Sequence, residues 1–428
     1  MKKLLLLLCL SLIWSCQNDP LVPDDIDDDI MIDDPIDEDP LNLTAEVKAY
    51  EESIIDKDSY VFAIENGKTR CYLLNKEGEV LNEWNLSSSL GNDISLESDG
   101  SLTGIFKPEN EPVFSFGGFG GIVKRIDPDG TEMWSYEVNN ENALSHHDVE
   151  LLPNGNVLFL VWEKLSTQDA QSMGVETEFD LYTESLWEIN PSTDEIVWKW
   201  NSIDHIVQNN DPELDNFGNP SENWKKIDLN KNPILENGDI MHANGIDYDN
   251  ERDLIYVSVN FYHEIWVIDH STSTEEAAGS IGGNYGIGGD LVYRFGDQPN
   301  LDIFDRNHFL NLIEGDFPGE NNMLVYVNGN SIEQSTAYEF KLPFEQFPTN
   351  EAPEVIWSFT HPQMYSRIVS GVEPLKNGNR LITEGDYGMW EITPEGQIAW
   401  KYEVDGNMLW RAYVFYPDDE AIQSLNLN

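Results

Sequence analysis

The sequence predicts an all-β protein, a six-bladed β-propeller of four-stranded blades. Three observations carry this prediction. A unit of apolar strand, polar turn and aromatic strand recurs six times, each copy is preceded by a hairpin, and no helical apolar period of any length competes with the pattern. Short strands repeated at intervals of about 50 to 60 residues are typical of propeller blades, in which four strands form one sheet beside a central channel.

The six copies differ mainly in the segments between their strands. Insertions at 164–185, 202–239 and 270–305 account for the unequal spacing, and we expect them to form loops at the rim. The recurring aromatic side chains are expected to pack one blade against the next. The apolar strand and the aromatic residue of each copy are 71–74 with Trp84, 122–126 with Trp134, 186–189 with Trp198, 265–268 with Tyr293, 337–340 with Trp357, and 389–392 with Trp400.

The first residues have the pattern of a secretory signal peptide, which we assign to residues 1–15. Two lysines precede an apolar run at 4–14 that is too short to span a membrane. Residues 13–16, Ile-Trp-Ser-Cys, resemble a bacterial lipobox, which implies lipidation of Cys16. The alternative is an ordinary signal peptide with an incidental cysteine. With the lipobox, we expect an outer membrane lipoprotein at the cell surface or facing the periplasm, held to the membrane only by this anchor.

An acidic segment follows, and we assign residues 16–43 to a disordered tether before a propeller that spans 44–428. Residues 18–40 contain eleven acidic side chains, four prolines and no basic side chain, a composition that cannot bury a core. An acidic stretch directly after a lipobox cysteine also resembles a surface-export signal of bacterial lipoproteins. The formal net charge of the chain is −55, so nucleic acid is not an expected partner, because phosphate binding needs a basic surface.

We expect no disulfide bond within the mature protein. The chain has three of them: Cys9 leaves with the signal peptide, Cys16 would carry the lipid, and Cys71 is left without a partner. We therefore expect an exported protein whose stability depends on its core alone.

Three of the eight histidines recur at one position of the repeat. Counting back from the aligned turns places His147, His242 and His308 at equivalent points of three successive blades, with Ser370 and Asn92 as the counterparts in two others. The first strand of each propeller blade is innermost, and all these strands begin at the same mouth of the channel. We therefore expect the three histidines to face one another there as a functional site.

Two chemistries fit such a cluster. The histidines could hold zinc or copper, with Asp148 as a fourth ligand or an orienting group. Alternatively, one histidine could act as a nucleophile while its neighbours bind an anion or move a proton. The glycine-rich segment 115–121 precedes a strand rather than a helix, so it is not expected to bind phosphate.

The motifs together resemble the bacterial arylsulfotransferases, which move a sulfuryl group between phenols without a nucleotide donor. The resemblance runs from the second blade to the sixth. It implies a six-bladed propeller that transfers the sulfuryl group from a phenolic sulfate to a phenolic acceptor, with small phenols as partners and no cofactor or metal. The segments that carry it are His-His-Asp with Pro-Asn-Gly-Asn at 146–156, His-x-Asn-x-Ile at 242–246, Leu-Val-Tyr-Arg-Phe-Gly at 291–296, the strand from His308 to an Asn-Gly at 328–329, and Lys-Asn-Gly-Asn-Arg-Leu-Ile at 376–382.

The resemblance also assigns residues. His308 matches the histidine that is transiently sulfurylated, and His147 and His242 match the two that surround the transferred group. Asn244 matches a substrate-binding asparagine. We expect His146, beside His147, to contribute to substrate binding as well.

Two positions depart from the family pattern. Asn260 stands where the family carries an arginine, and we expect it to hydrogen-bond the sulfuryl oxygens together with Asn244. Phe309 follows the expected nucleophile where an acidic residue is usual. Arg367, and Arg411 after the last blade, are candidates for a replacement cation, and Asn260→Arg is expected to raise transfer. The departures keep a second hypothesis open, a surface-exposed propeller that binds a ligand or partner without catalysis. A metal-binding propeller is the third.

Overall fold

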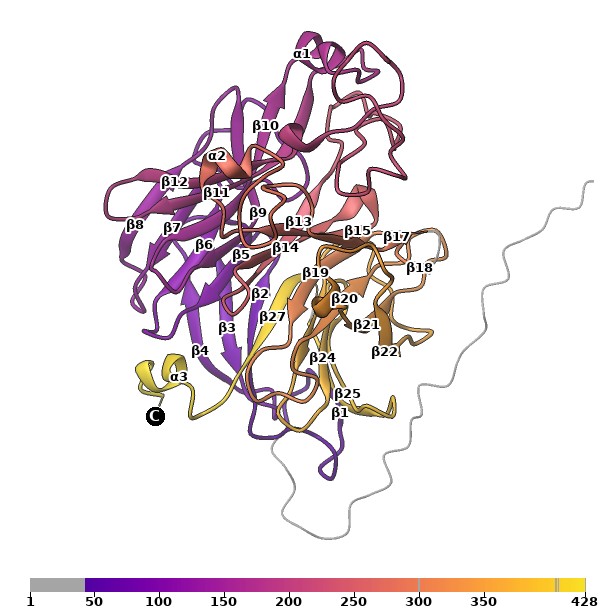
Figure 1. Cartoon of the computed structure of the whole chain (residues 1–428). Coiled ribbons are helices and arrows are strands. Elements are labelled where there is room, and N and C mark those ends of the chain that lie inside the picture. Colours follow the sequence, from indigo (N-terminus) through magenta and orange to yellow (C-terminus); the bar gives the residue numbers. More distant parts are fainter. Residues whose placement is uncertain (1–42, 299–300, 405, 407, 428) are drawn as a thin grey trace, which may run out of the picture. The chain divides into compact units, whose positions relative to one another are not determined.

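Six antiparallel sheets follow one another along the chain as the blades of a propeller, which confirms the predicted fold class (Figure 1). The computed structural model describes residues 43–298, 301–404, 406 and 408–427. The assigned signal peptide, Cys16 and the tether up to residue 42 lie outside the described residues. Within them, no helix is both long and apolar enough to cross a membrane.

Each blade contains four strands that run from the channel outward. In the first blade they are β27 (Leu409–Phe415), β2 (Tyr60–Glu65), β3 (Arg70–Leu74) and β4 (Val80–Asn85), and in the second β5 (Leu90–Leu96), β6 (Leu102–Phe106), β7 (Ile122–Ile126) and β8 (Glu132–Glu137). The third blade contains β9 (Ala143–Leu151), β10 (Val157–Leu165), β11 (Leu181–Asn190) and β12 (Glu195–Asn201), and the fourth β13 (Ala243–Asp249), β14 (Leu254–Val259), β15 (Glu264–Asp269) and β16 (Tyr293–Phe295). The fifth contains β19 (Asn307–Leu312), β20 (Asn322–Val327), β21 (Thr336–Lys341) and β22 (Glu354–Phe359), and the sixth β23 (Gly371–Pro374), β24 (Arg380–Glu384), β25 (Gly388–Ile392) and β26 (Ile398–Glu403).

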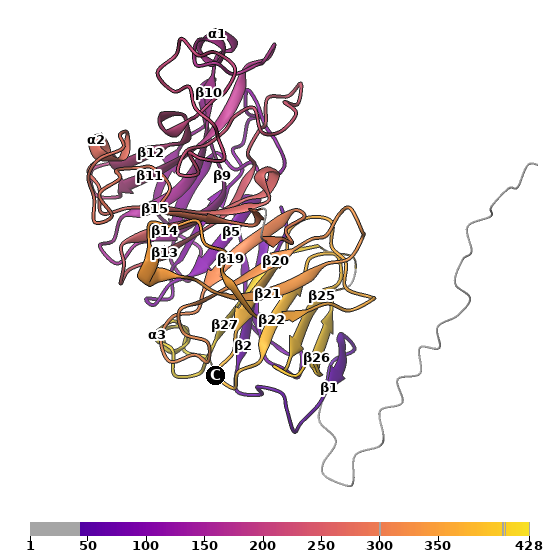
Figure 2. The same ribbon diagram turned by 45° about the vertical axis from the view of Figure 1, so that its right-hand side comes forward.

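Both ends of the described chain close the ring. Near the C-terminus, β27 is the inner strand of the first blade and pairs with β2, so yellow and indigo strands lie side by side in Figure 1. Near the other end, β1 (Val47–Tyr50) pairs with β26 as a fifth strand of the sixth blade (Figure 2). This closure corrects one expectation from the sequence. Arg411 does not follow the last blade but lies on the inner strand of the first, and it is buried.

The remaining elements are short and lie between strands. The insertion at 164–185 is shorter than expected, because β10 extends to Leu165 and β11 begins at Leu181. These elements are α1 (Thr167–Ser172), η1 (Ser202–His205), η2 (Asn260–Tyr262), α2 (Thr274–Ala277), β17 (Asp297–Gln298), β18 (Leu301–Asp302), η3 (Phe344–Gln346) and α3 (Glu420–Ser424).

The inner strands lose their regular register at the channel mouth. The pairing with the second strand shifts at this point in β5, β9, β13, β19 and β27. The backbone is left-handed at His147 (φ 55°), His242 (φ 52°) and Phe309 (φ 55°). Each non-glycine residue in this region costs about 1–3 kcal/mol, and such irregularities re-aim side chains beside active sites. The expected functional position therefore coincides with stored backbone strain.

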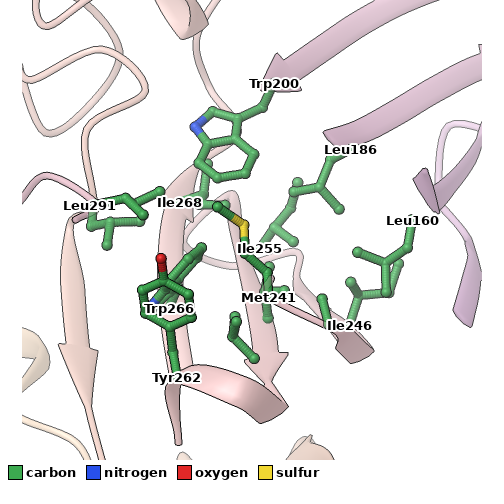
Figure 3. Close-up of a cluster of buried hydrophobic side chains, with 14 of the residues drawn as sticks. Leu160, Leu186, Trp200, Met241, Ile246, Ile255, Tyr262, Trp266, Ile268 and Leu291 are labelled. Carbon is green, nitrogen blue, oxygen red and sulfur yellow. The ribbon is translucent and has the colours of Figure 1, made fainter. Parts of the chain in front are cut away.

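Apolar contacts between blades form the core, as the aromatic pattern predicts. In the largest cluster, side chains of the third and fourth blades interdigitate (Figure 3). Trp200 and Trp266 are fully buried there, and Trp200 also donates to the carbonyl of Gly289 at 2.7 Å. Each large aromatic side chain buries roughly 150–250 Å². Cys71 is likewise buried, as a free thiol in β3.

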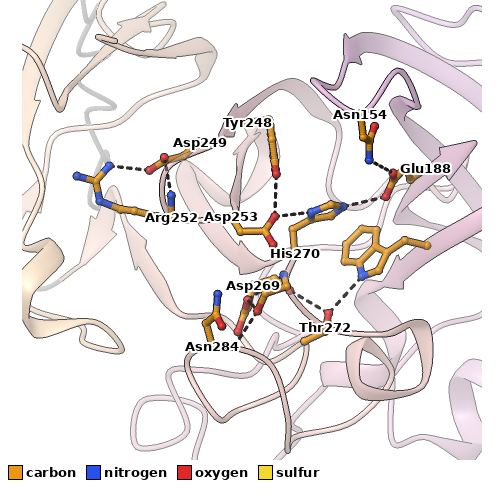
Figure 4. Close-up of polar contacts among 12 residues, drawn as sticks. Asn154, Glu188, Tyr248, Asp249, Arg252, Asp253, Asp269, His270, Thr272 and Asn284 are labelled. Atoms are coloured by element: carbon orange, nitrogen blue, oxygen red, sulfur yellow. Dashed lines mark hydrogen bonds and ion pairs between the residues drawn. The ribbon is translucent and has the colours of Figure 1, made fainter. Parts of the chain in front are cut away.

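A polar network joins the same two blades. His270 lies between two carboxylates, with Nδ1 at 2.7 Å from Asp253 and Nε2 at 2.9 Å from Glu188 (Figure 4). Burial opposes the charge on the ring, but the two carboxylates outweigh it and raise the pKa of His270 to about 9. The network therefore contains a charged histidine whose partners, Asp253 and Glu188, do not belong to the predicted histidine cluster.

Candidate active site

The structure brings His147, His242 and His308 together at the channel mouth, as the repeat predicts. The rings of His147 and His242 meet edge to face with centroids 4.9 Å apart, and both His242 and His308 lie close enough to His147 to lower its pKa. His147 and His308 are almost fully buried, whereas the His242 side chain is 15% exposed. His242 therefore marks the side from which a small molecule can approach the cluster.

The hydrogen bonds of Asn328 fix the tautomer of His308. Its amide nitrogen donates to the carbonyls of Ser366 and Val369 at 2.8 and 3.3 Å, so its Oδ1, 2.6 Å from Nδ1 of His308, is an acceptor. His308 must then carry its proton on Nδ1, which leaves a lone pair on Nε2. Burial lowers the pKa of His308 to about 3, so the ring is neutral at physiological pH. A neutral imidazole with a free Nε2 is a competent nucleophile.

The surroundings of His242 favour its protonated form. Its Nδ1 lies 2.6 Å from Oδ2 of the buried Asp239, and its ring stacks on Phe261 at 4.8 Å. Burial would lower the pKa of His242, but the Asp239 carboxylate outweighs burial and raises it. His242 can therefore present a cationic N–H beside a neutral His308.

His147 is the end of a chain of three polar side chains. Its Nδ1 lies 2.8 Å from Nδ1 of His146, and Nε2 of His146 lies 2.9 Å from Oε2 of Glu184. The His146 ring stacks on Trp162 at 3.7 Å, almost parallel. Burial and the charge of His242 lower the pKa values of both histidines well below the ordinary value, and burial raises the pKa of Glu184 to about 8. His146 thus contacts His147 and Glu184 rather than facing the opening.

The guanidinium of Arg306 lies beside Asn260, the position at which the family carries an arginine and this chain does not. Arg306 donates to Oδ1 of Asn260 at 3.1 Å and lies over the ring of Phe261 at 4.5 Å. In the described part of the chain it forms no ion pair with a carboxylate, and its charge acts on both His242 and His308. Arg306 lies two residues before the repeated position, which His308 occupies. The repeat pattern therefore did not indicate Arg306.

The two asparagines predicted to bind substrate, Asn244 and Asn260, donate to the backbone just before His308. The amide nitrogens of Asn244 and Asn260 both donate to the carbonyl of Asn307, at 2.9 and 2.8 Å. Through this carbonyl they position the peptide that enters His308. Contact of either side chain with a substrate remains a prediction.

The side chains of Phe309 and Arg411 stack on each other near the histidines. The Arg411 guanidinium lies 3.9 Å from the Phe309 ring centroid and pairs with Asp93 and Asp148. It also donates to the carbonyl of Asn244 at 2.9 Å. Arg411 is therefore neutralised by buried carboxylates and braces the inner strands, instead of replacing the cation expected at residue 260.

The glycine-rich segment 115–121 covers one side of the cluster. The carbonyl of Gly118 accepts from the backbone of His147 at 3.0 Å, and any side chain at Gly118 would collide with the tip of the His147 ring. The half-buried Phe116 ring lies 4.9 Å from Trp162. The segment joins the second and third strands of its blade, a connection that leaves a propeller blade at the mouth where the inner strands begin. That topology is the signal by which the sequence could have revealed this wall.

Arg367 is not brought to the histidines. Its side chain is exposed, and its carbonyl accepts from Asn330 at 3.1 Å. Among the described residues no group of three or more His, Cys, Asp or Glu side chains is arranged to hold a metal ion. A pocket of about 380 Å³ lies elsewhere, between the turns after β13 and β19 at the other end of the inner strands, and has no contact with the histidines.

Comparison with known families agrees with this arrangement. The model of the arylsulfotransferase (ASST) family matches residues 107–406, which is more than half of the chain and includes all three histidines. The chain belongs to the arylsulfotransferase family. Membership supports a sulfotransferase in general and phenolic substrates as a class.

Other comparisons add only distant likenesses to this arylsulfotransferase. No curated protein matches it. Among solved structures, a protein from Lactobacillus plantarum is 11% identical with a TM-score of 0.41, and the match covers 81% of this chain and 82% of that one. Hydrazine synthase of Kuenenia stuttgartiensis is 12% identical with a TM-score of 0.37, and the match covers 69% of this chain and 70% of that one. AztD of Citrobacter koseri is 10% identical with a TM-score of 0.37, and the match covers 83% of this chain and 97% of that one. At these scores they carry no argument about function.

Proposed function

We propose that this protein transfers a sulfuryl group from a phenolic sulfate to a phenolic acceptor in two steps, through a sulfurylated His308. The observation that carries the proposal is the acceptor role of Asn328, which leaves the Nε2 lone pair of a neutral His308 free in a site that also holds two cationic groups. Membership in the arylsulfotransferase family supports the reaction class.

In the first step, Nε2 of His308 forms a bond to sulfur as the bond from sulfur to the phenolic oxygen breaks. The leaving phenolate takes a proton and departs as a phenol. In the second step a phenolic acceptor gives up its proton, its oxygen attacks the same sulfur, and His308 is released unchanged. A phenolic sulfate and a phenol thus give a phenol and a new phenolic sulfate, with no other reactant.

The remaining groups have distinct tasks. His242, kept cationic by Asp239, and Arg306, kept in place by Asn260, stabilise the negative charge on the sulfuryl oxygens. His147 exchanges the phenolic proton. The half-exposed rings of Phe116 and Phe261 border the cluster and offer apolar contact to a phenol.

The test is release of phenol from a chromogenic aryl sulfate, measured with and without a phenolic acceptor. We expect release by the wild type to increase with acceptor, and His308→Ala to lose transfer by at least about a thousandfold. His361→Ala, which changes a histidine outside the cluster, is the matched control and should stay near wild type. Equal rates for wild type and His308→Ala would remove the catalytic assignment, and binding of aryl sulfates without turnover would favour the binding propeller.

A further inference from the structure

The proposed reaction leaves one chemical problem. His147 must take a proton from the acceptor, yet burial and, after it, the positive charge of His242 disfavour an imidazolium there. A proton left on this ring would raise the barrier to the second step. The site therefore needs a place away from the histidine cluster where the proton can be stored.

The side chains behind His147 provide that place. Oε1 of Glu184 is already bound by two donors, the backbone N–H of Ala243 at 2.8 Å and the indole of Trp162 at 3.2 Å. Its Oε2 lies 2.9 Å from Nε2 of His146, a close contact that is not aligned as a hydrogen bond, and neither buried atom has a hydrogen-bond partner among the described residues. Buried polar atoms are normally hydrogen-bonded, so a proton between this nitrogen and this oxygen would satisfy both after a small change of alignment.

We infer that Glu184 and His146 form a proton relay that stores the phenolic proton on Glu184. The inference rests on the proposed function and deepens it. When His147 receives a proton on Nε2, its Nδ1 proton passes to Nδ1 of His146, and the Nε2 proton of His146 passes to Oε2 of Glu184. Each ring gains one proton and loses one, so both stay neutral while the carboxylate becomes a carboxylic acid.

The same path works in reverse during the first step. The carboxylic acid gives its proton to Nε2 of His146, which passes its Nδ1 proton to His147, and His147 delivers its Nε2 proton to the departing phenolate. Glu184 ends as a carboxylate, ready for the acceptor. Burial raises the pKa of Glu184 to about 8, so both forms can be reached near neutral pH. His146 and Glu184 are positioning and relay residues that act through His147.

The geometry keeps this chain rigid. The His146 ring stacks on Trp162, whose indole nitrogen also donates to Glu184, so one side chain fixes both members of the relay. Backbone bonds hold the other end, since His147 donates from its N–H to the Gly118 carbonyl. A rigid chain allows proton transfer without rotation of any side chain.

The first experiment uses Glu184→Gln, which keeps an acceptor for Ala243 and Trp162 but cannot exchange a proton. With a nitrophenyl sulfate as donor, whose leaving group needs no proton, we expect the burst of nitrophenol to stay within about threefold of wild type. Transfer to weakly acidic phenols should fall about a hundredfold, and transfer to phenols already ionised at the assay pH should be nearly spared. His146→Phe, which retains a stacked ring, should show the same pattern.

Glu163→Gln is the matched control, because Glu163 also accepts from an indole, that of Trp187, in the same blade but without a histidine. It should behave as wild type. A loss in Glu184→Gln that is equal for all donors and acceptors would show a structural role only and overturn the relay. No loss with any acceptor would overturn it as well.

A measurement without turnover separates the relay from the proposed function. Nitrogen NMR of the imidazoles should show His146 and His147 exchanging tautomers together as wild type is titrated through about pH 8, and no exchange in Glu184→Gln. If the tautomers stay unchanged in a wild type that transfers the sulfuryl group, the relay is refuted and the proposed function is not. Exchanging tautomers in a wild type that transfers no sulfuryl group would support the relay while refuting the proposed function.

Discussion

Arg411 donates a hydrogen bond to Oδ2 of Asp148 at 3.0 Å and so joins the last inner strand of the chain to the residue that follows His147. Oδ2 of Asp148 also accepts from the backbone of Ile246 in the next blade. The closure of the ring and the position of His147 therefore depend on the same buried ion pair.

Replacing Arg411 with methionine is expected to destabilise the protein strongly. The change leaves Asp93 and Asp148 buried without their cation, a loss of about 3–5 kcal/mol. Chemical unfolding measures it. Lys48→Met, which breaks an exposed pair with Glu403, should cost less than about 1 kcal/mol. Similar losses for the two variants would contradict the bracing role of Arg411.

The cation of the site is expected to be Arg306. Arg306→Gln should lower kcat/KM for sulfuryl transfer by about a hundredfold to a thousandfold, since it removes a donor to the developing negative charge. Arg367→Gln, which changes an exposed arginine, is the control and should stay within about threefold.

The structure also changes what we expect of Asn260→Arg. Alone, it would place a second guanidinium against Arg306 and should not raise transfer. Combined with Arg306→Gln, it should recover at least about tenfold of the lost activity, because one cation again serves the site. If Asn260→Arg alone raises transfer, Arg306 does not fill this role.

Asp247 is expected to make stability fall as pH rises. Burial raises its pKa to about 7, despite a backbone hydrogen bond from Leu312 that opposes the shift. Because the folded state favours the protonated acid, this stabilisation is complete below the ordinary value of 3.8 and is lost as pH rises through about 7.

The corresponding variant is Asp247→Asn, which keeps an oxygen acceptor for Leu312. It should exceed wild type in unfolding free energy by on the order of 1–3 kcal/mol at pH 8 and match it near pH 3. The exposed Asp418→Asn should differ from wild type by less than about 0.5 kcal/mol at both pH values. A constant difference across the range would rule out titration of Asp247 as the cause.

His270 should give a second, separate loss at higher pH. Its pKa is raised to about 9 by Asp253 and Glu188, so its contribution is complete below the ordinary value of 6.5 and is lost as pH rises through about 9. Thermal unfolding of His270→Gln should show a lower midpoint than wild type at pH 6 and a much smaller difference at pH 10. A difference that grows with pH would have the wrong sign.

Lipidation of Cys16 remains a prediction from the sequence, since this residue lies outside the described residues. We propose that Cys16 anchors the protein to a membrane through lipid. Cys16→Ser should move the protein from the membrane fraction to the soluble fraction after export, as seen by fractionation. Retention in the membrane with an uncleaved signal would instead assign the anchor to residues 4–14.

The sequence by itself determined the blade count and the meeting of three histidines. Both depend on local alternation and turns such as Pro-Asn-Gly-Asn at 153–156, which fix where each strand begins, and a propeller then brings equivalent positions to one mouth. His147, His242 and His308 could be found in this way because each occupies the repeated position.

Only the tertiary structure decided the chemistry of each group. Arg306 and Glu184 occupy no repeated position. Arg306 lies 46 residues from its partner Asn260, and Glu184 lies 38 residues from its partner His146. Arg411 looked peripheral because ring closure, which carries it into the channel, is a contact between the two ends of the chain. Charge states such as neutral His308 and cationic His242 depend on burial and on partners assembled from several blades, and spacing along a sequence does not encode either.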